Sequence, residues 1–151
     1  MGEAIRRGAT GALASLVVAL AACESESIIE PGPDTGPLTA YIDGEAFIAE
    51  TALVDRLQTH IVVTASSGDR SLRFEFPDLG TRNYVIGPGN PVIAEVTIGS
   101  STWRADETTG NGTITVRESI PSYLAGSFDV RLEGSDGSTM ALTSGLFVII
   151  G

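Results

Sequence analysis

The pattern of apolar and polar residues from position 38 onward predicts strands along almost all of the remaining chain. In segment 72–76, leucine and phenylalanine alternate with arginine and glutamate, and segments 113–117 and 128–133 repeat this period of two. Such alternation is typical of strands that bury one face and expose the other, as in antiparallel sheets. We therefore expect one face of each strand to contribute to a common core.

Shorter apolar stretches, separated by turn residues, predict further strands. They are 38–43, 46–49, 60–65, 84–86, 92–98, 102–105, 140–142 and 146–150. Pairs such as Asp43-Gly44 and Asp136-Gly137 lie between them, and their residues tolerate the positive φ angles of tight hairpins. The spacing predicts an all-β fold, an antiparallel β-sandwich or flattened barrel of about 8–10 short strands. No convincing helix is expected, and segment 50–58 is the only candidate for a short turn of one.

Segment 128–133 sets a specific expectation for the core. Phe128, Val130 and Leu132 should point inward together, with the Phe128 ring packed against residues such as Ile114 or Phe147. The charged residues between them should face water.

Segment 146–150 is apolar at every position. A central strand covered on both sides would explain this composition, and we favour it over an exposed partner interface.

The first 22 residues follow a different pattern. Arg6 and Arg7 precede an apolar run that ends in Leu20-Ala21-Ala22-Cys23. A basic start, a short apolar run and a small-residue cleavage site are the parts of a secretory signal peptide. An uncleaved membrane helix is the alternative, but a span needs about 20 apolar residues and this run is shorter. The cysteine directly after the cleavage site resembles the lipobox of bacterial lipoproteins, and so predicts lipidation of Cys23.

Lipidation of Cys23 would use the only cysteine of the chain. By resemblance to bacterial lipoproteins, this residue would carry a diacylglycerol thioether and a third acyl chain on its amino group. One acyl chain binds membranes only marginally, so several chains would anchor the protein firmly. No thiol would remain for a disulfide or a metal, and the domain must be stable through its core alone.

The chain therefore divides into three parts. Residues 1–22 are the expected signal peptide, residues 23–37 the lipidated cysteine and a flexible tether, and residues 38–151 the all-β domain. The tether is rich in proline, glycine, serine and glutamate, which favours an extended spacer. Glu24 follows the cysteine in place of the aspartate that retains many lipoproteins in an inner membrane. This favours an outer-membrane location, on its periplasmic face or at the cell surface, in a host with two membranes.

Charge excludes one class of partner. The chain has 19 acidic residues against 9 arginines, has no lysine, and carries a net charge of −10. Nucleic acids select basic patches, so no nucleic-acid partner is expected. The same charge disfavours docking on anionic headgroups, and solubility is its simplest explanation. The membrane, through Cys23, is the one predicted partner, and a protein or glycan partner is left open.

Candidate catalytic and ligand residues are few. His60 is the only histidine, and alternation places it on the solvent side of its strand, so we expect no triad and no metal site around it. Several carboxylate pairs, such as Asp106-Glu107 and Glu75 with Glu95, could in principle serve a hydrolase. Solvated turns and faces are the simpler interpretation. No cofactor is expected, because the glycines precede strands where a phosphate loop would lead into a helix.

Three aromatic residues, Trp103, Tyr84 and Tyr123, are the possible ligand-binding residues. A platform of exposed rings would suit sugar stacking. The alternative, a Trp103 buried in the core, is favoured because Arg104 should occupy the opposite, outer face.

Several short motifs resemble a family of small, functionally uncharacterised bacterial lipoproteins. They are Thr39-Ala40-Tyr41-Ile42-Asp43-Gly44, a Gly80 to Tyr84 step, Gly112-Thr113-Ile114-Thr115-Val116, Ala125-Gly126-Ser127-Phe128 and Thr143-Ser144-Gly145-Leu146-Phe147. The resemblance implies an all-β fold and membrane attachment, and it brings no known activity. Physically, Gly112, Gly126 and Gly145 each precede an alternating segment and would permit bulges or sharp turns.

Three functions follow, in order of preference. The first is a non-catalytic envelope lipoprotein that acts in structure, adhesion or assembly. The second is a module that binds a carbohydrate or a small apolar molecule in a cleft. The third is a hydrolase with an unrecognised carboxylate site. An exposed aromatic row would favour the second, and two close carboxylates with a raised pKa would favour the third.

Overall fold

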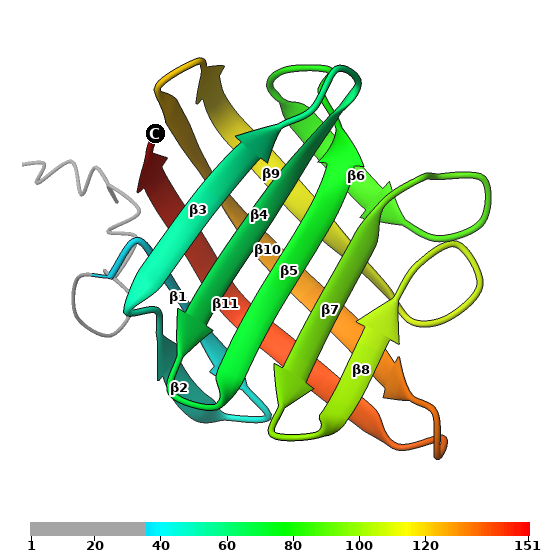
Figure 1. The fold of residues 1–151 in the computed structure, drawn as a ribbon. Helices are drawn as coiled ribbons and strands as arrows, with labels where there is room; N and C mark the ends of the chain where they lie inside the picture. The colour runs from blue at the N-terminus through cyan, green and yellow to red at the C-terminus, as the bar shows by residue number, and fades with distance from the viewer. Residues whose placement is uncertain (1–35) are drawn as a thin grey trace, which may run out of the picture.

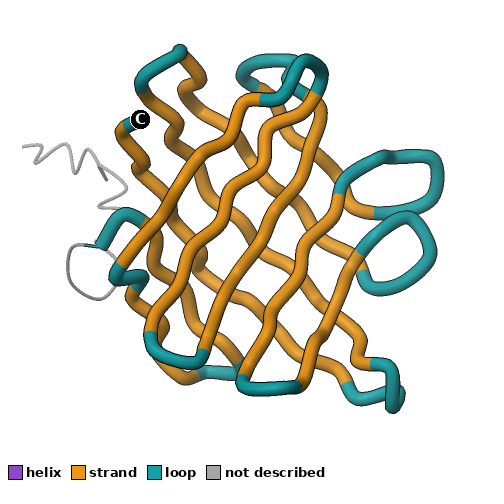
Figure 2. The backbone as a smooth tube through the Cα atoms, viewed as in Figure 1, coloured by secondary structure: helices purple, strands orange, loops and turns teal. Residues whose placement is uncertain are grey.

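A computed structural model describes residues 36–151, which form eleven β-strands joined by turns and short loops (Figure 1; Figure 2). The strands are β1 (Leu38–Ile42), β2 (Glu45–Ile48), β3 (Thr51–Arg56), β4 (His60–Ser67), β5 (Arg70–Pro77), β6 (Arg82–Ile86), β7 (Ile93–Ile98), β8 (Ser101–Ala105), β9 (Asn111–Ile120), β10 (Tyr123–Gly134) and β11 (Thr139–Ile150). The expected signal peptide, Cys23 and the tether up to residue 35 lie outside the described residues. Within residues 36–151, no helix is long and apolar enough to cross a membrane.

The strands pair antiparallel in one continuous sheet that curls into two facing layers. The order is β2-β1-β11-β10-β8-β7-β5-β4-β3, and β9 pairs with both β10 and β6. In Figure 1, β3, β4, β5, β7 and β8 form the front layer, and the other strands form the layer behind. The layers are continuous where the end of β10 pairs with β8, through Glu133 with Arg104 and Gly134 with Trp103. The predicted antiparallel sandwich or flattened barrel is confirmed.

The chain passes from one layer to the other between β2 and β3. The N–H of Ala49 donates to the carbonyl of Leu38 in the back layer, and the next N–H, that of Glu50, donates to the carbonyl of Ser66 in the front layer. Both bonds are 2.9 Å long. The backbone N–H groups of two consecutive residues thus bond to different layers, so the connection between the layers is short.

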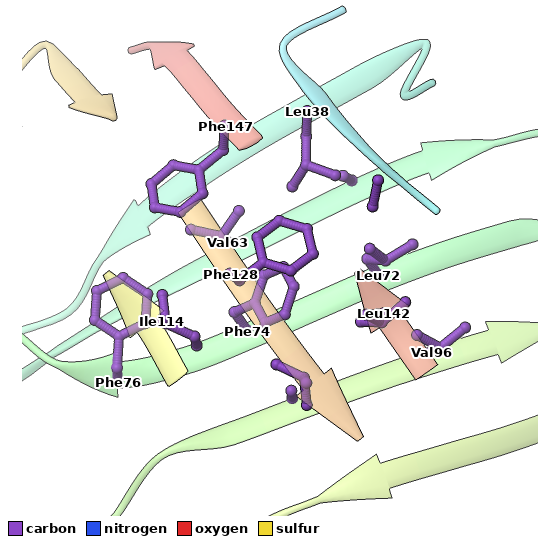
Figure 3. Close-up of a cluster of buried hydrophobic side chains, with 14 of the residues drawn as sticks. Leu38, Val63, Leu72, Phe74, Phe76, Val96, Ile114, Phe128, Leu142 and Phe147 are labelled. Carbon is purple, nitrogen blue, oxygen red and sulfur yellow. The ribbon is translucent and has the colours of Figure 1, made fainter. Parts of the chain in front are cut away.

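The core fills the space between the layers, with phenylalanine rings at its centre (Figure 3). Phe74 of the front layer meets Phe128 of the back layer with ring centroids 4.5 Å apart, and Phe128 lies 6.4 Å from Phe147. Val130 and Leu132 are also buried, whereas Arg131 is exposed. The inward face expected for segment 128–133 is confirmed.

Two glycines make room for these rings. Phe128 pairs across the sheet with Gly145, and Gly126 pairs with Phe147. A Cβ atom on Gly145 would collide with the Phe128 ring, and one on Gly126 would collide with the Phe147 ring and the carbonyl of Thr115. The register shift next to Gly126 confirms a bulge there. The glycines expected to shape the sheet therefore also accommodate its largest side chains.

The strands differ from the expected ones in two places. Segment 50–58 contains no helix: residues 51–56 form β3, an edge strand whose outward side chains include Leu53. Segments 140–142 and 146–150 belong to one strand, β11. With β3 added, the count is eleven, slightly above the number expected.

The expectation that segment 146–150 is covered on both sides was also wrong. Phe147 and Ile149 are buried, but Val148 is 51% exposed and Ile150 is 79% exposed. No second layer covers the outer face of β11 in the part of the chain that the structure describes. The apolar outward residues of this strand therefore need another explanation.

Candidate functional site

The three possible ligand-binding aromatics lie on three different strands, in three different surroundings. Tyr84 on β6 is only 4% exposed and packs against Phe76, with ring centroids 4.8 Å apart. Its hydroxyl donates to the carbonyl of Gly80 (2.7 Å) and accepts from the N–H of Leu79 (3.2 Å). Burial raises the pKa of Tyr84, so the phenol stays neutral. Tyr84 is a core residue that holds the β5–β6 loop.

Tyr123 begins β10 on the outer face of the back layer. It pairs with Ile120 on one side and Ile150 on the other, and it is half-buried. Its ring therefore belongs to an apolar surface at the end of the sheet.

Trp103 lies on β8, facing inward, because it pairs with the buried Val96. It is half-buried and packs against the core, which agrees with the favoured core placement in part. Its Nε1 donates to Ser138 Oγ (2.9 Å), and Ser138 Oγ donates to Asp136 Oδ1 (2.6 Å). This short chain of bonds ties β8 to the β10–β11 turn.

A depression of about 590 Å³ lies beside Trp103. Besides Trp103, the residues that line it include Ser101, Thr102, Thr109 and Glu133. An aromatic ring beside hydroxyls and carboxylates is the combination that carbohydrate sites use. Tyr84 and Tyr123 line no part of this depression, so the three aromatics form no common platform.

Arg104 is the centre of a charged cluster on the outer face of the front layer. Its Nε donates to Asp106 Oδ2 (2.8 Å) and its Nη1 to Glu95 Oε2 (3.3 Å). The hydrogen bond to Asp106 is the main reason that the pKa of Arg104 is raised. On β5, Arg73 pairs in the same way with Glu75 (2.6 Å).

Asp106 is held by its own turn as well as by Arg104. Its Oδ1 accepts from the backbone N–H of Thr108 (2.8 Å) and of Thr109 (3.1 Å), and from the Thr108 hydroxyl (2.8 Å). These bonds, with that from Arg104, hold the pKa of Asp106 well below its usual range. A carboxyl group that stays ionised cannot donate a proton at neutral pH, so Asp106 suits a structural role better than general acid catalysis.

Of the remaining candidates for catalysis, His60, Glu75, Asp106 and Glu107 line one depression. Two other acidic residues have partners elsewhere: Glu45 lies 3.3 Å from Arg70, and Asp43 accepts the N–H of Ala141 (2.7 Å). His60 Nδ1 lies 2.7 Å from Thr59 Oγ1, at the edge of a depression of about 370 Å³ that Glu75 and Asp106 also line. In residues 36–151, no three side chains of histidine, cysteine, aspartate or glutamate are grouped to hold a metal ion.

One surface was missed by the sequence reasoning. Four large apolar side chains are exposed at one end of the sandwich, and we call this the apolar end: Leu57, Leu79, Ile120 and Ile150. Leu57 and Leu79 lie in turns, and Ile120 and Ile150 at strand ends. Apolar residues at turn positions are the signal that could have suggested it.

The fold places the chain among all-β proteins built from one curled antiparallel sheet. Residues 34–151 match a family described as Domain of unknown function (DUF6252), and the chain belongs to this family. No curated protein and no solved structure matches the chain. Membership of a functionally uncharacterised family was expected and is confirmed. The family description names no activity, so a function can be inferred only from the residues of this chain.

Proposed function

We propose that this protein is a bacterial envelope lipoprotein, anchored through lipid on Cys23, whose domain acts in structure, adhesion or assembly without catalysing a reaction. The observation that carries the proposal is Leu20-Ala21-Ala22-Cys23 at the end of an apolar run with a basic start. The cysteine of this motif is the only one in the chain, so no other residue offers the same chemistry.

The charged residues of the domain support the non-catalytic part of the proposal. Glu75 and Glu95, which would have to act as a catalytic pair, are each bonded to an arginine. Asp106 is fixed by its turn, and its lowered pKa keeps it ionised. An inverting or retaining glycosidase needs one carboxyl group with a raised pKa, and the pKa of Asp106 is shifted in the opposite direction.

Metabolic labelling with a palmitate analogue tests the anchor in bacterial cells that express the full chain. The wild type should acquire the label and fractionate with membranes, whereas Cys23→Ser should lose the label and be either soluble or uncleaved. A matched control, Cys23→Ser/Ser25→Cys, moves the thiol two positions away from the cleavage motif and should stay unlabelled. Labelling of either variant would show that the lipid is attached elsewhere, and the anchor assignment would fail.

A second candidate function, carbohydrate binding, is favoured by the depression beside Trp103. Its test is a glycan array probed with the mature chain, residues 23–151. Trp103→Ala should abolish any binding, whereas Val85→Ala, which shortens an exposed side chain on β6, should leave it intact. If the wild type gives no signal on the array, carbohydrate binding is rejected and the envelope lipoprotein without catalytic activity remains as the proposed function.

A further inference from the structure

The apolar end brings together residues that are far apart in the sequence. Leu57 is 56% exposed, Leu79 is 62% exposed and Ile120 is 48% exposed. They belong to the β3–β4 turn, the β5–β6 loop and the end of β9, which lie together at the top of Figure 1 with the C terminus beside them. Exposed apolar side chains of this size that gather on one surface usually mark a contact.

The guanidinium of Arg56 holds these segments together. Its Nη2 donates to the carbonyl of Ile120 (2.7 Å), and both of its terminal nitrogens lie 3.2 Å from Ser119 Oγ. Its Nη1 also contacts Asp78, the residue before Leu79, at 3.5 Å. The N–H of Gly151 donates to the carbonyl of Ser122 (3.0 Å), which fixes Ile150 beside the β9–β10 turn. The apolar side chains are thus presented by braced segments.

The opposite end of the sandwich has the opposite character. Its turns carry Asp43, Asp69 and Asp136, and none of the large exposed apolar side chains lies in them. We call it the acidic end. At the apolar end, the turns carry one carboxylate, that of Asp78, which Arg56 partly neutralises. Arg82 and Glu118 on the adjoining strands have opposite charges. The turns at the two ends therefore differ in their number of carboxylates, three at the acidic end against one at the apolar end.

The chain leaves the domain close to the apolar end. The carbonyl of Pro37 accepts the N–H of Val148, and Ile150 lies two residues further along the same strand, about 7 Å away. The acidic end lies at the other end of β11, whose first residue is Thr139. Measured along β11, the tether therefore joins the domain nearer to Ile150 than to the acidic end.

We propose that the apolar end docks on the lipid bilayer, with Leu57, Leu79, Ile120 and Ile150 inserted at the boundary between headgroups and acyl chains. This inference rests on the proposed lipid anchor. Four side chains on turns and strand ends give only weak, reversible insertion by themselves. The tether, residues 24–37, supplies the high local concentration that makes this insertion effective. Anionic headgroups would repel the acidic end, which reinforces the same orientation. The occupant is lipid because the proposed anchor on Cys23 already holds the domain beside a bilayer, at a local concentration that a protein partner would not share.

Depth-dependent quenching by brominated lipids tests the orientation. The mature chain keeps the whole buried core, which lies between Leu38 and Ile149, and its only thiol is Cys23. Cys23 is coupled to a maleimide lipid in phosphatidylcholine vesicles whose acyl chains are brominated. In the Trp103→Phe/Leu79→Trp variant, the single tryptophan reports on the apolar end. Its emission should fall by about half or more, because interfacial side chains lie about 5–10 Å into the boundary.

Two controls keep the result specific. The Trp103→Phe/Leu53→Trp variant places the probe on β3 at a side chain of matched exposure, 66% against 62%, and its emission should not change. Trp103 in the wild type reports on the acidic end and should also be unaffected. Adding Leu57→Ser and Ile120→Ser to the Leu79→Trp variant should relieve the quenching.

Equal quenching at positions 79 and 53 would indicate contact without a preferred end and would overturn the proposal. Absence of quenching at position 79 would also overturn it and would point to a protein partner for the apolar end. The coupling is chemical, so neither result depends on whether cells lipidate Cys23. Palmitate labelling tests that question separately.

Discussion

The phenyl ring of Phe128 on β10 lies against Gly145 on β11, in the space that a Cβ atom at residue 145 would occupy. The ring cannot move away easily, because Phe74 of the facing layer packs against it at 4.5 Å. Position 145 therefore needs glycine for reasons of space. The same relationship joins Phe147 to Gly126, so the two longest strands are matched by two reciprocal pairs of phenylalanine and glycine.

Gly145→Ala should destabilise the domain. Replacing a glycine can stabilise a protein by about 0.4–1 kcal/mol through the unfolded state, but overpacking costs about 1–3 kcal/mol, and the collision with Phe128 makes the second effect dominate. Urea denaturation measures the change in the free energy of unfolding. Gly151→Ala is the control, since its Cβ would lie 3.8 Å from the nearest atom, the carbonyl oxygen of Pro121.

Phe128→Leu combined with Gly145→Ala should reduce the free energy of unfolding by less than the sum of the two single changes. Strict additivity would contradict the proposed collision.

Phe128→Ala should lower the melting temperature sharply, whereas Arg131→Ala should barely change it. Phe128 is 3% exposed and contacts two other rings, and truncation of such a residue costs about 3–5 kcal/mol. Arg131 is exposed on the same strand, where changes usually remain within about 0.5 kcal/mol. Thermal denaturation of both variants gives the comparison. Similar effects would mean that β10 does not bury the face assigned to it.

Arg56 should stabilise the domain mainly through its bond to the carbonyl of Ile120. Arg56→Lys keeps the charge but loses the guanidinium, whose two terminal nitrogens bond Ile120 and Ser119 at the same time. We expect the free energy of unfolding to fall by about 1–2 kcal/mol. Asp78→Asn should cost less than about 0.5 kcal/mol, since the 3.5 Å ion pair is partly exposed. Chemical denaturation in low and high salt distinguishes the two contributions. A larger loss for Asp78→Asn, removed by salt, would assign the stability to the ion pair.

Asp106 should make the domain sensitive to acid. The folded structure lowers its pKa, so the ionised carboxylate stabilises the domain above the unfolded pKa of about 3.9, and this contribution is lost as the pH falls further. Asp106→Asn should be less stable than the wild type at neutral pH and should lose less stability on acidification. Urea midpoints at about pH 7 and pH 3 provide the measurement. Asp129→Asn, an exposed change on β10, is the matched control and should keep the acid sensitivity of the wild type.

The sequence predicted the interior of the sheet well, because its central strands bury one face. Segments 72–76, 113–117 and 128–133 show the alternation, and all three lie in strands with the expected face inside. Segment 51–56 does not show it clearly, since at the edge of the sheet Leu53 points outward and is exposed. The alternation of apolar and polar residues is weaker in an edge strand, because the facing layer covers only part of it.

The candidate sites were less predictable. Each tyrosine could be a ligand residue in the sequence, and only the fold shows that Tyr84 is buried with both of its hydrogen bonds made inside the protein. The apolar end could not be inferred, because Leu57, Leu79 and Ile120 are separated by more than twenty residues each and meet only through Arg56. Such a cluster depends on topology, which local patterns do not determine.

Exposure of the domain at the cell surface is testable by protease treatment of intact cells. Glu24 after the cysteine favours an outer membrane, and the acidic start of the tether is compatible with surface display. A displayed domain should be released from intact cells by cleavage in the tether. A domain on the periplasmic face should be cleaved only after lysis, and that result would exclude display.

Intact-mass spectrometry of the protein extracted from bacterial membranes tests the anchor most directly. A chain that begins at Cys23 and carries the added mass of a glycerol group and acyl chains is the predicted result, with the ester-linked chains removed by mild base. Full-length protein that retains residues 1–22, or a chain that begins at Cys23 with an unmodified thiol, would contradict the assignment of this protein as a lipid-anchored domain.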